Sequence, residues 1–295
     1  MSKEERHFGP VWFIPGENRG KYPFCHSVYI EGAKVLIDPA SDRERLVQLR
    51  ESPGVETVWL SHWHEDHFMH LDLFDGLPLC ISAADAPPLS DLEVLMDAYG
   101  INEDTRDHWR PIFENQFHFR PRKVTRFLVG GEVLDLGTVR VEVISTPGHT
   151  PGHLSFFFQG PEILFLGDYD LSKFGPWYGD VQSSIQRTIE SVEHLRDIPA
   201  KMWLTSHESG VFQEAPGRIW DEYLGVIAER EGKLIDFLEE PRTMEEIVEA
   251  WIIYGKPREP KVFYEFGERV HMKKHLERLM GQGMVALRGD RYTRV

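Results

Sequence analysis

Short apolar or alternating segments separated by glycine-containing turns dominate the first 225 residues and predict β-strands. These segments are 11–14, 27–31, 33–38, 57–60, 79–82, 131–135, 139–145, 154–159, 162–166 and 202–205. Two hairpins are predicted, one turning at Gly137 and one at Gly160. Residues 42–52 place Leu46 and Leu49 on one side of an amphipathic helix, and 182–196 predict a second helix. Because strands and helices recur in turn, the pattern predicts an α/β protein with mixed sheets covered by helices.

Residues 85–127 interrupt this pattern with a stretch rich in charged and aromatic residues. Helices are predicted near 91–99 and 104–117. We interpret the stretch as a helical insertion. It is expected to form either a lid over the functional site or a brace or homodimer surface.

Helices follow one another from about residue 226 onward. The first is predicted over 230–238, the second begins with a capping-box spacing at Thr243 and Glu246, and the third covers 264–280. Two short strands, 284–287 and 291–295, end the chain. Three helices and a terminal hairpin describe a winged-helix module. The prediction is therefore a catalytic domain over 1–225 and a winged-helix domain over 226–295.

Charge and composition narrow the possible partners and locations. The chain of 295 residues has a net charge of −15, which disfavours binding to phosphate backbones. Residues 226–295 hold 13 acidic and 13 basic residues, so the acidic excess lies upstream. No apolar run approaches the roughly 18 residues of a membrane span, and the first residues lack the apolar core of a signal peptide. A cytoplasmic protein without membrane association is expected, with Cys25 and Cys80 as buried thiols.

The strongest chemical signal is the segment 61–67, Ser-His-Trp-His-Glu-Asp-His, directly after a predicted buried strand. It supplies four potential metal ligands within six residues: His62, His64, Asp66 and His67. Imidazole and carboxylate groups together suit zinc, iron or manganese. The segment therefore predicts a metal site at a strand end.

Further candidate ligands follow other strands. His149 lies in the segment Thr-Pro-Gly-His-Thr-Pro-Gly-His over 146–153, Asp168 follows the strand 162–166, and His207 follows the strand 202–205. Because each candidate comes just after a strand, all are expected to converge at one edge of the sheets.

These residues give the chain a resemblance to the metallo-β-lactamase fold superfamily over roughly residues 10–215. The resemblance implies an αββα sandwich with the metal site at one edge. It places one metal on His62, His64 and His149, and a second on Asp66, His67 and His207, with Asp168 bridging. The flavodiiron branch usually has Glu where this chain has His64, which disfavours oxygen reduction. Mononuclear iron dioxygenases keep much of the motif and stay an alternative.

The chemistry of such a site is hydrolysis. Two divalent metals about 3.5–4 Å apart share a water that becomes hydroxide near neutral pH. Asp168 and Asp66 are the predicted catalytic carboxylates; Asp66 either binds metal, which we favour, or orients the water. The expected cofactors are two divalent ions, zinc by preference, with iron or manganese as alternatives. The expected substrate is a small-molecule ester, thioester or lactone, and an endoribonuclease or phosphodiesterase is the other alternative.

Several residues receive weaker predictions. His153 and His70 are expected to support the ligands or to pack, and not to bind metal. The aromatic segment 169–181 is expected either to wall the pocket or to anchor a loop, with Lys173 pairing with a substrate carboxylate.

The C-terminal pattern resembles the winged-helix extension of the β-lactamase-like protein 2 group. It differs from the C-terminal helical domain of glyoxalase II, and this difference disfavours a glutathione thioester as the substrate. Its third helix mixes acidic and basic residues, so a structural or substrate-shaping role is favoured over nucleic-acid binding. The charged residues of this helix are Glu265, Glu268, Arg269, Lys273, Lys274, Glu277 and Arg278.

Overall fold

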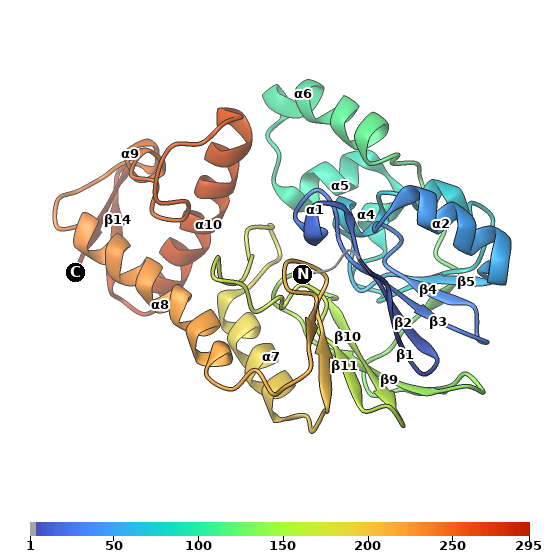
Figure 1. The fold of residues 1–295 in the computed structure, drawn as a ribbon. Coiled ribbons are helices and arrows are strands. Elements are labelled where there is room, and N and C mark those ends of the chain that lie inside the picture. The colour runs from blue at the N-terminus through green and yellow to red at the C-terminus, as the bar shows by residue number, and fades with distance from the viewer. Residues whose placement is uncertain (1–3) are drawn as a thin grey trace.

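Two β-sheets packed face to face form the centre of the computed structural model, which describes residues 4–295 (Figure 1). The first sheet has seven strands in sequence order. Its first four strands are antiparallel, and β4 to β7 run parallel. The strands are β1 Arg6–Phe8, β2 Val11–Ile14, β3 Ser27–Ile30, β4 Val35–Ile37, β5 Thr57–Trp59, β6 Leu79–Ile81 and β7 Arg126–Phe127.

The second sheet has six strands in the order β13-β12-β11-β10-β9-β8. Both predicted hairpins are confirmed, because β8 pairs with β9 and β10 with β11 in antiparallel fashion. A parallel pairing of β11 with β12 brings the carboxyl ends of these two strands to one edge. The strands are β8 Val133–Asp135, β9 Arg140–Ser145, β10 Leu154–Gln159, β11 Ile163–Phe165, β12 Met202–Leu204 and β13 Val211–Phe212.

Alternation along the strands separates three apolar layers. Val28 and Ile37 of the first sheet pack against Val143 and Phe156 of the second. On the outer face of the first sheet, Tyr29 and its neighbours pack against helix α2 (Arg43–Leu49) and helix α5 (Leu92–Tyr99). The second sheet is covered by helix α7 (Ile185–Asp197). This order of helix, sheet, sheet and helix confirms the predicted αββα sandwich.

Side-chain caps explain where the covering helices begin. The carboxylate of Asp42 accepts the backbone N–H of Arg45 at the start of α2, and Ser184 caps α7 in the same way. Leu46 and Leu49 of α2 are buried, as their spacing predicted.

The stretch 85–127 folds as short helices beside the first sheet and returns to it as β7. The helix predicted over 104–117 is broken. Helix α6 (Arg106–Pro111) ends at a proline, which lacks the N–H needed for a further α-helical bond, and a wider π-turn follows over Ile112–Gln116. The other short helices are α1 Glu17–Gly20, α3 Glu65–Phe68 and α4 Pro87–Ser90.

The C-terminal part has the predicted order of helices and a hairpin. Helices α8 (Ile219–Phe237), α9 (Met244–Glu249) and α10 (Lys261–Gly281) precede the antiparallel strands β14 (Val285–Arg288) and β15 (Arg291–Arg294). They enclose an apolar core of their own. The capping box at Thr243 and Glu246 is present. The assignment of these elements as a winged helix stays a prediction.

Helix α8 begins eleven residues before the predicted start at 230 and crosses the predicted domain boundary at 225/226. Its first turns, with Trp220 and Tyr223, pack on the second sheet, and its last turns, with Leu234, belong to the C-terminal core. The two predicted domains therefore share one helix. No helix within residues 4–295 has both the length and the apolar character that crossing a membrane requires.

Candidate metal centre

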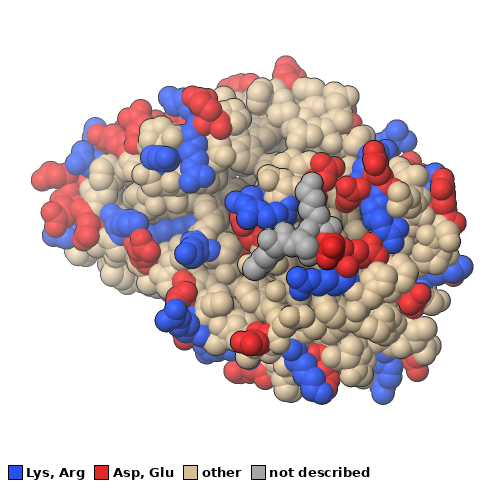
Figure 2. All heavy atoms as spheres, viewed as in Figure 1, with Lys and Arg blue, Asp and Glu red and all other residues tan. Residues whose placement is uncertain are grey.

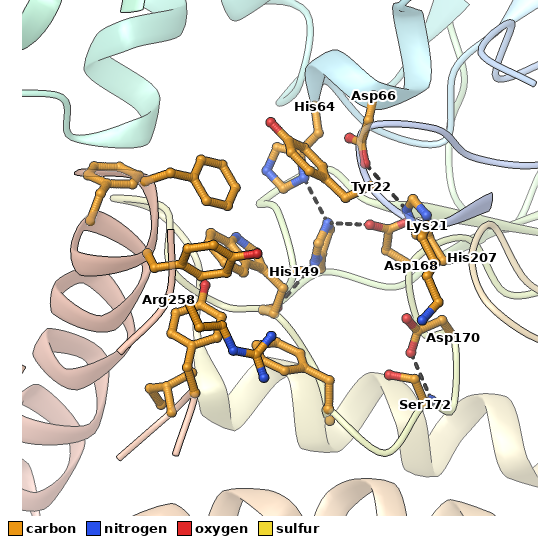
Figure 3. Close-up of a pocket in the computed structure, with 18 of the residues that line it drawn as sticks. Lys21, Tyr22, His64, Asp66, His149, Asp168, Asp170, Ser172, His207 and Arg258 are labelled. Atoms are coloured by element: carbon orange, nitrogen blue, oxygen red, sulfur yellow. Dashed lines mark hydrogen bonds and ion pairs between the residues drawn. The ribbon is translucent and has the colours of Figure 1, made fainter. Parts of the chain in front are cut away.

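Loops that follow strands carry all seven predicted ligands to one edge of the sandwich. The segment 61–67 follows β5 and enters α3, His149 lies between β9 and β10, and Asp168 and His207 follow β11 and β12. The seven form two neighbouring groups: His62, His64, His149 and Asp168, and then Asp66, His67 and His207. Figure 3 shows His64, His149, Asp168 and His207 pointing toward one another.

Three imidazole nitrogens of the first group face one another at short range. His62 Nε2 lies 3.0 Å from His64 Nδ1, and His149 Nε2 lies 3.1 Å from the former and 2.9 Å from the latter. His62 and His149 are at most 1% exposed and His64 is 5% exposed. Tetrahedral coordination at about 2.0–2.1 Å would place such nitrogens at comparable separations.

Five of the seven candidate ligands are histidines, and each has one ring nitrogen that faces the other ligands, the inward nitrogen, and one that points away, the outward nitrogen. Each outward nitrogen donates a hydrogen bond to an acceptor of its own. His64 Nε2 donates to Asp180 (2.8 Å), His149 Nδ1 to the carbonyl of Trp177 (3.1 Å), and His207 Nδ1 to the carbonyl of Gly20 (2.6 Å). His62 Nδ1 donates to Ser61 Oγ, and His67 Nδ1 to Asp38. Because the outward nitrogens carry the protons, the five inward nitrogens are free to act as metal ligands.

Asp168 connects the two groups. Its Oδ2 lies 3.2 Å from His149 Nε2, while its Oδ1 lies 2.9 Å from His67 Nε2 and 3.3 Å from His207 Nε2. Asp168 Oδ1 and His67 Nε2 are buried atoms without a hydrogen bond among residues 4–295. Asp66 approaches only the second group, with Oδ2 3.5 Å from His207 Nε2. The donor set, five neutral imidazoles and two carboxylates, fits a pair of divalent cations.

The buried charges perturb one another strongly. Burial raises the pKa of Asp168, but His67 and His207 outweigh it and hold that pKa well below its usual range. Burial lowers the pKa of His207, yet the neighbouring Asp168 raises it to about 9. Burial also opposes the effect of Asp180 on His64, whose pKa nevertheless rises to about 9. A metal ion would therefore displace protons when it binds to the second nitrogens of these rings.

Three carboxylates that support the site were missed by sequence reasoning. Asp38, fully buried after β4, accepts from the backbone and hydroxyl of Ser61 and from His67. Asp180 holds His64, and Asp85 accepts from the Thr150 hydroxyl and the Gly152 N–H, fixing the loop that carries His149. Asp38 follows a strand just as the ligands do, and that position was the available signal.

The weaker candidates take supporting places. His153 Nδ1 donates to Thr146 Oγ1 (2.8 Å), so its Nε2 accepts the backbone N–H of Asp168 (3.2 Å) and is not available for a metal. His70 forms a third group with Asp72 and His118, but Arg43 already binds both oxygens of Asp72 at 2.9 and 2.6 Å.

Both cysteines, Cys25 and Cys80, are buried free thiols, as predicted. Burial raises the pKa of Cys25 well above its usual value.

A cavity of about 720 Å³ opens over the two groups. Three parts of the chain line it: loops of the sandwich, the stretch 85–127 and the C-terminal helices. Figure 2 shows this face hollowed where the C-terminal helices meet that stretch, with acidic and basic residues interspersed around it. The aromatic lining residues are Tyr22, Tyr99, Trp109, Phe113, Phe174, Trp177, Tyr254, Phe263, Tyr264 and Phe266.

Glu65, between ligands His64 and Asp66, joins two walls of this cavity. Tyr22 donates to one of its oxygens (2.8 Å) and Tyr99 to the other. Burial and the adjacent Asp66 raise the pKa of Glu65. The carboxylate thereby ties the stretch 85–127 to the ligand-bearing loop.

Helix α10 contacts the stretch 85–127 and the segment that precedes the helix. Trp109 packs against its Phe263 and Phe266, and the buried Glu268 accepts the backbone N–H groups of Ile253 and Tyr254. These contacts fix the position of α10 against the stretch 85–127.

Comparisons with known proteins agree with this geometry. The family model described as "Metallo-beta-lactamase superfamily" matches residues 21–207. A probable metallo-hydrolase from Streptococcus pyogenes is 28% identical over 161 residues, covering 52% of this chain and 62% of that protein. Hydroxyacylglutathione hydrolase GloC from Haemophilus influenzae is 27% identical over 45% of this chain and 59% of its own length. An atrochrysone carboxyl ACP thioesterase from Aspergillus fumigatus is 27% identical over 56% and 47%.

The chain thus spans about three fifths or less of the length of these curated relatives. A crystal structure of a metallo-beta-lactamase family protein from Thermus thermophilus superimposes with a TM-score of 0.72 at 22% identity. It covers 97% of this chain and 99% of that chain, so the likeness in fold extends through the C-terminal helices.

Proposed function

The chain belongs to the metallo-beta-lactamase superfamily, and on that premise we propose that it is a metal-dependent hydrolase of a small-molecule thioester, ester or lactone. The observation that carries the proposal is the cluster of inward imidazole nitrogens of His62, His64 and His149, 2.9 to 3.1 Å apart. Three imidazole nitrogens this close together can share one metal ion, which replaces any proton bound between them. Thioesters come first because the relatives include a hydroxyacylglutathione hydrolase and an ACP thioesterase.

The seven candidate ligands would bind two metal ions. His62, His64 and His149 would hold one ion and Asp66, His67 and His207 the other, with Asp168 between them. When bound, a pair of divalent ions activates water and polarises the carbonyl group of the substrate. His153 fixes the backbone of Asp168, and Asp38 fixes His67, so the ligands are held before substrate arrives. The aromatic walls offer the substrate an apolar surface.

We expect close to two metal ions per chain, zinc by preference, after repletion of the purified protein. The reason is that each group offers three donors of its own and shares Asp168. Elemental analysis measures the content. One ion or fewer per chain after repletion would contradict the dinuclear model and favour the mononuclear dioxygenase alternative.

A panel of chromogenic substrates tests the activity itself. Zinc-loaded protein is offered a thioester, a carboxylic ester, a lactone, a β-lactam and a phosphodiester. Turnover of the first three supports the proposal. Turnover of the phosphodiester alone would contradict it and favour a phosphodiesterase.

Two cations in the cavity wall that are unpaired within residues 4–295, Lys173 and Arg258, favour an anionic group on the substrate. The lining carboxylates Glu208 and Glu229 pair with Lys21 and Lys233, whereas Arg258 forms no ion pair within the described part of the chain. The lining residue Lys173 also forms no ion pair with residues 4–295. The guanidinium carbon of Arg258 lies 5.5 and 5.6 Å from the rings of Tyr254 and Tyr264, and Figure 3 shows the side chain reaching into the cavity.

The Arg258→Ala variant is expected to raise KM about tenfold for a thioester bearing a carboxylate, because a charge-assisted hydrogen bond contributes about 1.5–3 kcal/mol. The kcat should change little, since Arg258 is not among the residues that would hold the metal ions. A neutral thioester of the same size and the Lys256→Ala variant serve as controls. An equal rise in KM for the neutral substrate would show that the arginine acts through packing alone.

A further inference from the structure

The segment 174–181 is wedged between the first metal group and the C-terminal helices. On its inner side, the carbonyl of Trp177 accepts His149 Nδ1 (3.1 Å), and Asp180 accepts His64 Nε2 (2.8 Å). The indole N–H of Trp177 also donates to Asp180 (3.3 Å). The position of this segment therefore sets the orientation of two of the three histidines in the first group.

Arg230 of α8 binds the same segment from the side that faces away from the first metal group. Its side chain, 3% exposed, donates to the carbonyls of Phe174 (2.6 Å) and Pro176 (3.3 Å) and to the Tyr178 hydroxyl (2.8 Å). It forms no ion pair with a carboxylate among residues 4–295. A buried guanidinium is costly unless it is fully hydrogen-bonded, so these backbone acceptors compensate for its burial.

Helix α10 binds the C-terminal end of the segment 174–181. Lys274 Nζ donates to the carbonyl of Val181 (2.7 Å), and Tyr178 donates its hydroxyl proton to His275 Nε2 (2.8 Å). The His271 ring lies 4.3 Å from the Trp177 ring in an edge-on arrangement.

Two glycines show how little space remains between the segment and the helices. A Cβ atom on Gly175 would lie 2.7 Å from the Val226 side chain of α8. A Cβ atom on Gly179 would lie 2.6 Å from the Val270 side chain of α10. Displacement of either helix would therefore be transmitted to the segment.

The histidines of the second metal group are held by other parts of the chain. The outward nitrogen of His67 is held by Asp38, and that of His207 by the carbonyls of Gly20 and Phe24. All of these acceptors lie in the N-terminal part of the chain. The C-terminal helices reach this group only indirectly, through Phe263 of α10, which stacks on Tyr22, and Tyr223 of α8, which donates to the carbonyl of Asp168 (3.2 Å).

We propose that Arg230 and Lys274 are positioning residues through which the C-terminal helices set the metal affinity of the position formed by His62, His64 and His149. The position formed by Asp66, His67 and His207 is left unchanged by them. This inference rests on the proposed metal-dependent function. It assigns the C-terminal part of the chain a role in the metal centre besides its place in the cavity wall.

The test compares stepwise zinc affinities of the full-length chain. Metal-free Arg230→Met, Lys274→Met and wild-type proteins are titrated with Zn²⁺ against a chromophoric chelator. Each variant should bind one of the two ions about 10–100-fold more weakly, the usual cost of losing a group that orients a ligand. The other ion should bind as in the wild type. Arg230→Lys, which keeps one donor group, should lose less than Arg230→Met.

Controls identify the affected position and separate positioning from stability. Arg269→Met removes an α10 cation that pairs with Glu245 at the surface, and it should leave both affinities unchanged. The Co²⁺ spectrum of singly loaded Arg230→Met should match that of singly loaded His149→Ala, which keeps only the second position. Lys274→Met removes the hydrogen bond to Val181 and a 3.6 Å ion pair with Glu277 on the same helix, and it carries the test if Arg230→Met fails to fold.

Equal weakening of both ions in Arg230→Met, or a lower melting temperature with both affinities intact, would overturn the inference. A wild-type protein that binds no Zn²⁺ would instead overturn the proposed function.

Discussion

The Asp168→Ala variant is expected to remain folded and to lose hydrolysis by at least about a thousandfold. Its two carboxylate oxygens face different groups, Oδ2 at 3.2 Å from His149 and Oδ1 at 2.9 Å from His67. Without this anion, the repulsion between two cations in a buried space would be offset less well. Occupancy of the second metal should fall along with the rate. Both quantities are measured on the same samples, with the substrate that the panel identifies.

Two companion variants sharpen this prediction. Asp168→Asn keeps the shape but offers a neutral, weaker ligand, so added metal should rescue it only in part. His153→Ala removes the acceptor of the Asp168 backbone N–H and should cost about 10–100-fold. If His153→Ala lost both metals while Asp168→Ala kept them, the assignment of ligands would be wrong.

The clustering of the seven candidate ligands was predictable because each obeys a local rule, whereas their supports do not. His62, His149 and His207 follow apolar strands, and strand ends of one sandwich meet at an edge. Asp180, by contrast, lies 116 residues from His64 in an irregular segment, and only the tertiary fold brings the two together. Asp38 could have been predicted as a supporting residue, since it too follows a strand, but no recognisable motif surrounds this single carboxylate.

The fold was predictable where the hydrophobic pattern is local. The two hairpins and the capping box at Thr243 follow from turn and cap residues and are confirmed. The early start of α8 was missed because Gly225 lowers its helix propensity by about 1 kcal/mol. Packing of Trp220 and Tyr223 on the second sheet outweighs that loss. A structural or substrate-shaping role was predicted for the C-terminal part, but the residues of α10 that line the cavity were not, because the docking of two separately cored parts leaves no periodic signal.

A chain ending at residue 225 is expected to be poorly soluble and to bind at most one metal tightly. The cut leaves seven residues of α8, fewer than the roughly 12–15 that an isolated helix needs. It also uncovers Tyr178, Ile185 and Trp109, which pack against Ile227 or α10. Exposure of each large apolar side chain costs about 1.5–3 kcal/mol, a sizeable share of a net stability of about 5–15 kcal/mol. Soluble yield and stepwise zinc affinity measure the two effects.

A chain ending at residue 283 is the matched control, because it loses only the terminal hairpin and keeps Arg230 and Lys274 in place. It should retain both zinc affinities, with a lower melting temperature because Val285 leaves the C-terminal core. All seven ligands lie upstream of both cuts, so any difference in metal binding between the two chains must come from helices α8 to α10. If the chain ending at 225 stayed soluble and bound two zinc ions as tightly as the full chain, the segment 174–181 would hold His64 and His149 without help. The catalytic part would then be independent of everything after residue 225.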